Sequence, residues 1–172
     1  TLGQDTIRHA LIAAAIGISL VLVFMGIWYG SAGMIANVAV LLNLMLQLSA
    51  IALLGATLTL PGFAGLALTV GMAVDSNVLI NERIKEELRA KKSLRAAVDA
   101  GYQHAFSAII DGHVTTFISG VVLLQYGTGP IKGFAVTLLI GIVANLFTGV
   151  FCTRVVFDWL VRGLRVKKLS LG

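Results

Sequence analysis

The sequence predicts an all-α polytopic membrane protein, with five transmembrane helices and one cytoplasmic amphipathic helix. Of the 172 residues, 58% are hydrophobic and 12% are charged, whereas soluble domains carry about 25% charged residues. No Asp, Glu, Lys, Arg or His occurs from residue 10 to residue 74. As helix, this stretch would be roughly 100 Å long, about three crossings of a hydrocarbon core. Lipid is therefore the predicted main solvent.

Four segments rich in glycine, serine, proline or charge interrupt the apolar sequence: 29–33, 57–61, 82–104 and 126–130. Such clusters typically end helices. The predicted spans cover residues 7–29, 33–57, 61–82, 104–126 and 131–160, followed by a basic tail over 161–172.

The charged stretch 82–103 is predicted to form an amphipathic helix along the membrane surface, because Ile80, Ile84 and Leu88 recur at helical spacing. Two interpretations stay open for it. It is either an orienting segment without specific partners or a surface that docks other subunits.

The basic residues indicate the orientation of the chain. They gather in residues 83–95 and 162–168, and basic loops stay in the cytoplasm. Five crossings with a cytoplasmic C-terminus leave the N-terminus periplasmic. Membrane orientation also explains the net charge of +5 better than nucleic-acid binding does.

Asp75 is the first candidate functional residue. It follows Pro61 by 14 positions, which is about 21 Å of helix and reaches the middle of the hydrocarbon core. An ionised carboxylate there costs several kcal/mol, so it must be protonated, paired or hydrated. We predict a proton-translocating acid. The alternative is a permanently protonated hydrogen-bond donor between helices.

Asp111 is the second intramembrane acid and a weaker candidate for proton transfer, because it lies only about two turns into its span. Ser107, Thr115 and Ser119 share its face at successive i+4 positions. We expect this polar face to look into the helix bundle, because hydrocarbon does not solvate it.

Two asparagines and a histidine supply further polar groups. Asn77 is expected either to bond neighbouring helices or to line a polar path. Asn145 belongs to a row of small and polar residues expected to pack closely against other helices: Gly133, Thr137, Gly141, Asn145, Gly149 and Thr153. His113 points about 160° away from Asp111 on a helix, which favours a tethering or interfacial role over titration near neutral pH.

The sequence offers no other chemistry. Residues 127–132 lack the Gly-Lys-Ser/Thr ending of a phosphate-binding loop, and no Cys/His spacing suits a metal. We therefore predict no enzyme activity and no cofactor, the transported species being protons.

Three blocks of the sequence resemble the SecD family. Residues 71–88 (GMAVDSNVLINERIKEEL) are similar to the motif of its fourth transmembrane helix, and residues 101–116 and 126–135 match further blocks in order. The family usually carries Asp-Ala-Asn in both acid motifs. Here they are Asp75-Ser-Asn77 and Asp111-Gly-His113, so the second motif has an imidazole where the family has an amide.

The resemblance implies half of a resistance-nodulation-division bundle in the bacterial inner membrane. The other half would come from SecF, beside the SecYEG channel and YajC. It also implies a first helix and a large periplasmic region before residue 1, and a proton-conducting role for the acid at Asp75. The cycle would use the proton motive force to promote late translocation of a polypeptide. Alternatives are half of a small-molecule or lipid exporter, or a passive translocon scaffold.

Overall fold

Prolines and polar caps set where the helices begin in this computed structural model. The structure describes residues 2–56 and 58–163, with α1 (Leu2–Leu53), α2 (Leu60–Arg89), α3 (Leu94–Tyr126), α4 (Pro130–Asn145), the π-helix η1 (Leu146–Cys152), α5 (Thr153–Asp158) and the π-helix η2 (Trp159–Gly163). Pro61 and Pro130 stand in the first turns of α2 and α4, where a missing N–H costs no hydrogen bond. Thr59 accepts a 3.2 Å hydrogen bond from the Gly62 N–H and donates one of 3.4 Å to the Pro130 carbonyl. This threonine therefore caps α2 and ties the two proline turns together.

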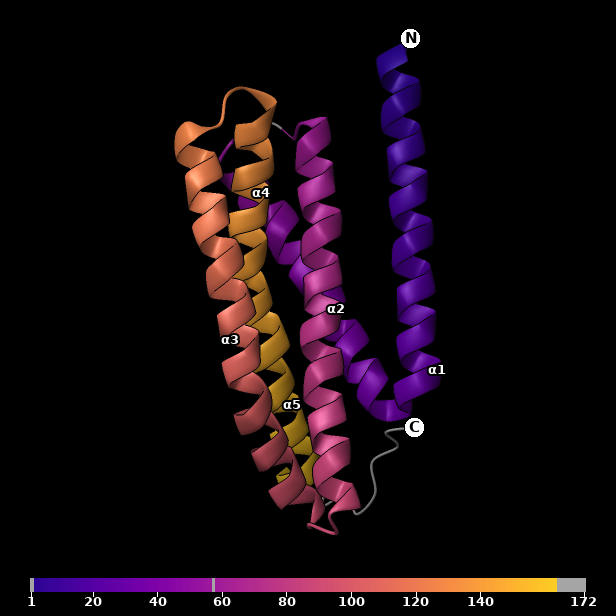
Figure 1. Ribbon diagram of the computed structural model, residues 1–172. Helices are drawn as coiled ribbons and strands as arrows, with labels where there is room; N and C mark the ends of the chain where they lie inside the picture. The colour runs from indigo at the N-terminus through magenta and orange to yellow at the C-terminus, as the bar shows by residue number, and fades with distance from the viewer. Residues whose placement is uncertain (1, 57, 164–172) are drawn as a thin grey trace.

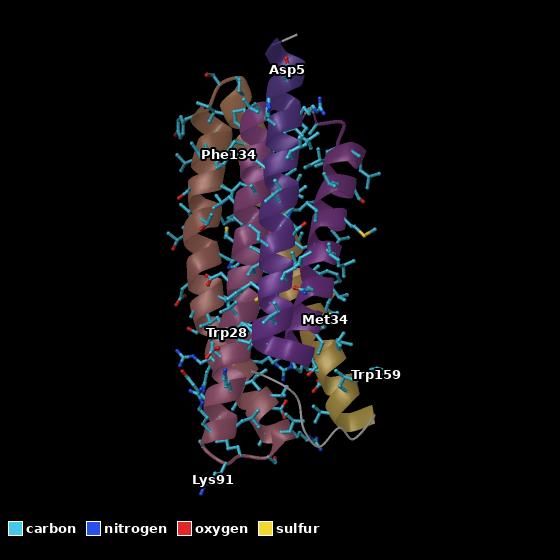
Figure 2. All side chains as sticks on the ribbon, turned by 90° about the vertical axis from the view of Figure 1, so that its right-hand side faces the viewer. Asp5, Trp28, Met34, Lys91, Phe134 and Trp159 are labelled. Carbon is cyan, nitrogen blue, oxygen red and sulfur yellow. The ribbon has the colours of Figure 1, made fainter. Side chains whose placement is uncertain are left out.

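The helices run between two ends of the molecule (Figure 1). The start of α1 lies at the end that also carries both proline turns, which we call the proline end. The bend of α1 and the turn between α2 and α3 lie at the other end, which we call the lysine end. Figure 2 shows Asp5 and Phe134 toward the proline end and Lys91 at the lysine end.

The α1 helix is broken at Gly30, whose φ of 53° and ψ of −124° are not helical. Its two arms turn back on each other there (Figure 1). Only glycine adopts this backbone conformation without strain. Close approach continues at Gly33, where a Cβ would lie 1.9 Å from the Met25 carbonyl oxygen. The predicted break at 29–33 is thus a tight bend.

Four helical stretches of the described chain are long and apolar enough to cross a membrane: Arg8–Leu53, Leu60–Arg89, Leu94–Tyr126 and Pro130–Val161. The all-helical membrane-type bundle is therefore as predicted. The predicted spans 7–29 and 33–57 correspond to the two arms of α1, which form one continuous apolar stretch up to Leu53. Whether each arm crosses the membrane separately, which makes five crossings, stays a prediction. The basic tail beyond residue 163 lies outside the described residues.

The prediction of one amphipathic helix over 82–103 is wrong. The chain instead continues α2 to Arg89 and starts α3 at Leu94. Lys91 has a φ of 61°, and this left-handed residue ends α2 in the manner of a C-cap. Ser93 then caps α3 by accepting a hydrogen bond from the Ala96 N–H at 3.4 Å. The apolar spacing of the segment belongs to the last turns of α2.

Helix α2 lies at the centre of the packing, against α1, α3 and α4. Small residues let these helices approach: a Cβ on Gly141 would lie 2.3 Å from Thr69 Cγ2, and one on Gly101 would lie 2.5 Å from an Ile84 side-chain carbon. The predicted packing row is confirmed for its buried members: Thr137, Gly141, Asn145, Gly149 and Thr153. Close backbone contact at these small residues therefore adds to the packing of a buried apolar cluster between α2 and α3, which includes Ile84, Tyr102 and Ile109.

Candidate functional site

Asp75 lies on the exposed face of α2. The next two residues, Ser76 and Asn77, are buried. Successive helical side chains are separated by about 100°, so the acid falls on the side of α2 that no other helix of the described chain covers. This exposed row of α2 consists of Ala64, Ala67, Leu68, Gly71 and Asp75.

The polar face of α3 has the predicted members, but it points outward. Ser107, Asp111, Thr115 and Ser119 are all exposed. Thr115 Oγ1 donates to the Asp111 carbonyl at 2.9 Å, and Ser119 Oγ to the Thr115 carbonyl at 3.1 Å. These two hydroxyls bond their own helix, so they need no polar partner from another helix of this chain. The described helices of this chain do not cover this face, so the expectation that it looks into a helix bundle stays a prediction.

Neither acid has an ion-pair partner among the described residues, and no group of three or more metal-ligating side chains occurs there. Arg154 instead lies 3.7 Å from Asp99 and stacks over the Tyr102 ring at 5.7 Å from its centroid. It lines an open groove of about 590 Å³ between α3 and the last helices. The arginine is therefore occupied away from Asp75.

A buried polar cluster lies behind the exposed acids. His113 from α3, Asn145 from the end of α4 and Ser76 from α2 are 5%, 1% and 4% exposed. Asn145 Nδ2 lies 2.7 Å from His113 Nε2 and 3.3 Å from Ser76 Oγ. His113 Nδ1 contacts the Ile109 carbonyl oxygen at 2.7 Å. The expected tethering histidine is present, and it joins three helices.

Asn77 bonds its own helix. Its amide nitrogen donates to the Ala73 carbonyl at 2.8 Å, and its side chain is 3% exposed. Of the two predicted roles for this residue, neither a bond to a neighbouring helix nor a polar path is seen in the described contacts. Asn145 does supply the interhelical amide that the sequence indicated.

Sequence reasoning missed a second polar network, which links α1 to α2 and η1. Gln47 accepts a 2.8 Å hydrogen bond from Thr69 and donates to Asn43. Asn43 donates in turn to Thr148 Oγ1 at 3.4 Å. The detectable signal was the pair of amides four residues apart in an otherwise apolar stretch, since residues at this spacing share a helix face.

The site therefore has two layers. Exposed carboxylates on α2 and α3 form the outer layer, and buried hydroxyl, amide and imidazole groups form the inner one. Among the described residues of this chain, no basic side chain forms an ion pair with either carboxylate of the outer layer.

Comparisons with known proteins agree with this description. Residues 1–163 match the family model described as protein export membrane protein SecD/SecF, C-terminal. The protein translocase subunits SecD of Anaeromyxobacter dehalogenans and Koribacter versatilis are 53% and 54% identical over 162 and 172 residues. These alignments cover 94% and 99% of this chain but only 26% and 32% of the relatives.

Solved structures show the same fold. The crystal structure of SecDF, a translocon-associated membrane protein from Thermus thermophilus, superposes with a TM-score of 0.88 at 45% identity. A second SecDF structure, in a super-membrane-facing form, superposes with a TM-score of 0.89 at 44% identity. Each match covers 95% of this chain and less than a quarter of the other. The chain belongs to the SecD/SecF family of protein export membrane proteins and corresponds within it to the C-terminal domain of SecD.

Proposed function

We propose that this domain couples the proton motive force to late steps of protein translocation across the bacterial inner membrane, with Asp75 as its proton carrier. The observation that carries the proposal is the exposure of Asp75 on α2, where no charged residue precedes it in the helix. A bare carboxylate facing hydrocarbon costs several kcal/mol. In this proposal, a second protein surface covers the carboxylate in the membrane and takes the place of hydrocarbon.

The covering surface is assigned to SecF, whose half-bundle would supply the charge that Asp75 lacks in the described chain. The polar face of α3 with Asp111 would lie against the same partner or line a hydrated path beside it. SecYEG, YajC and the translocating polypeptide are the further partners. These assignments rest on family membership and on the two uncovered polar faces.

The proposed energy source is sufficient for such coupling. One proton that crosses a membrane potential of 100 mV releases about 2.3 kcal/mol. This free energy biases a two-state conformational equilibrium by roughly fiftyfold. Motion of one half-bundle against the other would transmit this free energy. The proposed coupling needs no nucleotide.

We further propose a five-crossing topology with a periplasmic N-terminus and a cytoplasmic lysine end. Each arm of α1 would cross once, so that the bend at Gly30 falls in the cytoplasm. The turn at the lysine end carries Lys91, Lys92 and Arg95, as the positive-inside rule expects. Trp28 and Trp159 are 55% and 61% exposed and lie toward that end (Figure 2), where aromatic side chains mark a membrane interface.

The test replaces Asp75 by Asn in the full-length protein, reconstituted with SecF and SecYEG in proteoliposomes. Asp75→Asn should abolish proton conductance and the gradient-dependent part of export, because an amide does not release a proton. Asp111→Asn should cause a smaller loss. Asp5→Asn, at an exposed position near the start of α1, is the matched control and should behave as wild type.

Undiminished conductance and export in Asp75→Asn would refute the proton-carrier assignment. Export that is also insensitive to collapse of the gradient would identify a passive scaffold. Transport of a dye or lipid in the absence of SecYEG would instead identify an exporter half.

A further inference from the structure

The buried cluster of Ser76, His113 and Asn145 has a defined protonation state. The His113 Nδ1 atom lies 2.7 Å from the Ile109 carbonyl oxygen, and a carbonyl only accepts, so Nδ1 carries the hydrogen. The Nε2 atom faces the amide nitrogen of Asn145 at 2.7 Å, and an amide nitrogen only donates. This arrangement of contacts suits the tautomer in which Nε2 presents its lone pair to the amide.

The orientation of the Asn145 amide is coupled to that charge state. In the observed orientation, Asn145 Nδ2 donates to both His113 Nε2 and Ser76 Oγ. If Nε2 gained a proton, it would become a donor and would oppose the amide nitrogen. Turning the amide over would bring the Asn145 oxygen to Nε2 and restore an acceptor. Each orientation of the amide thus suits one charge state of the imidazole.

The observed orientation is incompletely satisfied. Asn145 Oδ1 is buried without a hydrogen-bond partner among the described residues, and such an orphan acceptor is costly. Turning the amide over would give this oxygen a donor, the protonated Nε2. If Asn145 only held the helices together, an unpaired side-chain oxygen would bring no benefit. If the amide alternates between two orientations, its hydrogen bonds cannot all be satisfied in both of them.

Asn145 also stands at a change in backbone geometry. Helix α4 ends at this residue and the π-helix η1 begins at the next; π-helical turns are frequent at functional sites. The orphan oxygen lies beside Gly149 of η1, where a Cβ would come within 2.9 Å of it. The glycine leaves room for the amide to turn.

No fixed ionic partner among the described residues sets the charge of His113. Helix α1 carries no ionisable side chain from residue 10 to its last residue except Tyr29. In α2, the ionisable residue nearest in sequence to Ser76 is Asp75. In α3, the one nearest to His113 is Asp111, and both acids are exposed. Over α4 and η1 the ionisable groups are Lys132, at the proline end, and Cys152.

We propose that His113, Asn145 and Ser76 form a buried proton-binding site, in which the Asn145 amide turns over when His113 takes up a proton at Nε2. The step forms one N–H bond on the imidazole, releases nothing and adds one positive charge. This site goes beyond the exposed acids assigned above and would exist even if Asp75 carried no proton. Because Ser76 adjoins Asp75 in α2, the turn-over links the outer acid layer to η1.

The test is ¹⁵N-histidine solid-state NMR of the full-length protein with its SecF partner in lipid nanodiscs. The His113→Gln variant identifies the His113 signals by difference. At pH 8.5 we expect a protonated Nδ1 and an unprotonated Nε2, and on acidification the Nε2 signal should convert to the protonated form. His104, exposed and paired with Glu87 at 3.1 Å, serves as the internal reference.

Two variants test the role of the amide. Asn145→Asp places a carboxylate, which only accepts, opposite Nε2, so the protonated signal should appear at least one pH unit higher, a tenfold gain in proton affinity. Ser76→Ala removes an acceptor that favours the observed orientation and should shift the conversion in the same direction by less. The His104 signal should not move in either variant.

Two results of these NMR measurements would overturn the proposal. If His113 Nε2 stays unprotonated down to pH 5.5 in the wild type and in Ser76→Ala, the cluster is a structural tether and the proposal fails. It also fails if His113 is protonated but converts at one pH in all variants. Loss of export in Asp75→Asn, measured separately, bears only on the proton carrier.

Discussion

Tyr102 of α3 donates a 2.8 Å hydrogen bond from its hydroxyl to Thr153 Oγ1 at the start of α5. Its ring is 2% exposed and packs edge-on against Phe157, with centroids 6.0 Å apart. The Thr153 hydroxyl in turn donates a 2.6 Å hydrogen bond to the Gly149 carbonyl. Helix α3 is thereby fixed to the start of α5, next to the π-helix η1, through one buried hydroxyl pair.

Tyr102→Phe should lower the free energy of unfolding by about 1 kcal/mol, because it removes one buried hydrogen bond and keeps the ring. The Thr153 hydroxyl retains its bond to Gly149, so no donor is left unpaired. Thermal unfolding of the full-length protein in detergent measures the effect. Tyr126→Phe is the matched control, since Tyr126 is 81% exposed; equal stability of both variants would show that the hydroxyl pair contributes nothing.

Gly33→Ala should destabilise the bend of α1 by about 1–3 kcal/mol, the usual cost of overpacking. The new Cβ would lie 1.9 Å from the Met25 carbonyl oxygen, so the two arms must separate. Gly17→Ala, on the same helix, meets nothing within 4 Å and should be neutral or slightly stabilising, because alanine is the better helix former. Proteolysis near the bend and thermal unfolding report the difference; if both substitutions are tolerated equally, the arms do not approach this closely.

The positions of the helices could be predicted from sequence because their signals are local. Pro61 and Pro130 fit only the first turn of a helix, and Gly30 lies in the break that the glycine and serine cluster indicated. The turn at Lys91 was missed because no local signal marks it. Lysine has no special preference for the left-handed conformation, so nothing local marked the end of α2.

Which face of each helix is covered within this chain could not be predicted, because that depends on how all the helices pack together. Periodicity grouped Asp111 with its polar neighbours on one face of α3, but it did not show that the described chain leaves this face uncovered. The same holds for Asp75. The histidine cluster was hidden for another reason: the ring nitrogens of His113 contact the backbone of α3 and the side chain of Asn145, 32 residues away, and no local pattern encodes such a pair.

Gln47→Leu should cost about 1–3 kcal/mol, because it leaves the buried Asn43 side-chain oxygen without its donor. Gln47 is 0% exposed, and leucine is apolar and of similar size, so lost hydrogen bonding is the main effect. Thr69 keeps a 2.9 Å bond to the Leu66 carbonyl. Gln125→Leu, at an exposed position of α3, is the control; a cost equal to that of the control would mean that the network does not stabilise the contact of α1 with α2.

Lys91→Gly should raise the free energy of unfolding by about 1 kcal/mol. Lys91 has a φ of 61°, a conformation that costs roughly 1–2 kcal/mol for a residue with a Cβ and little for glycine. Lys92→Gly is the matched comparison at the neighbouring position. It relieves no left-handed residue and removes the 2.5 Å ion pair with Glu87, so it should be neutral or mildly destabilising. Thermal unfolding of the two variants measures the difference, and a lower midpoint for Lys91→Gly than for Lys92→Gly would contradict the left-handed cap at the end of α2.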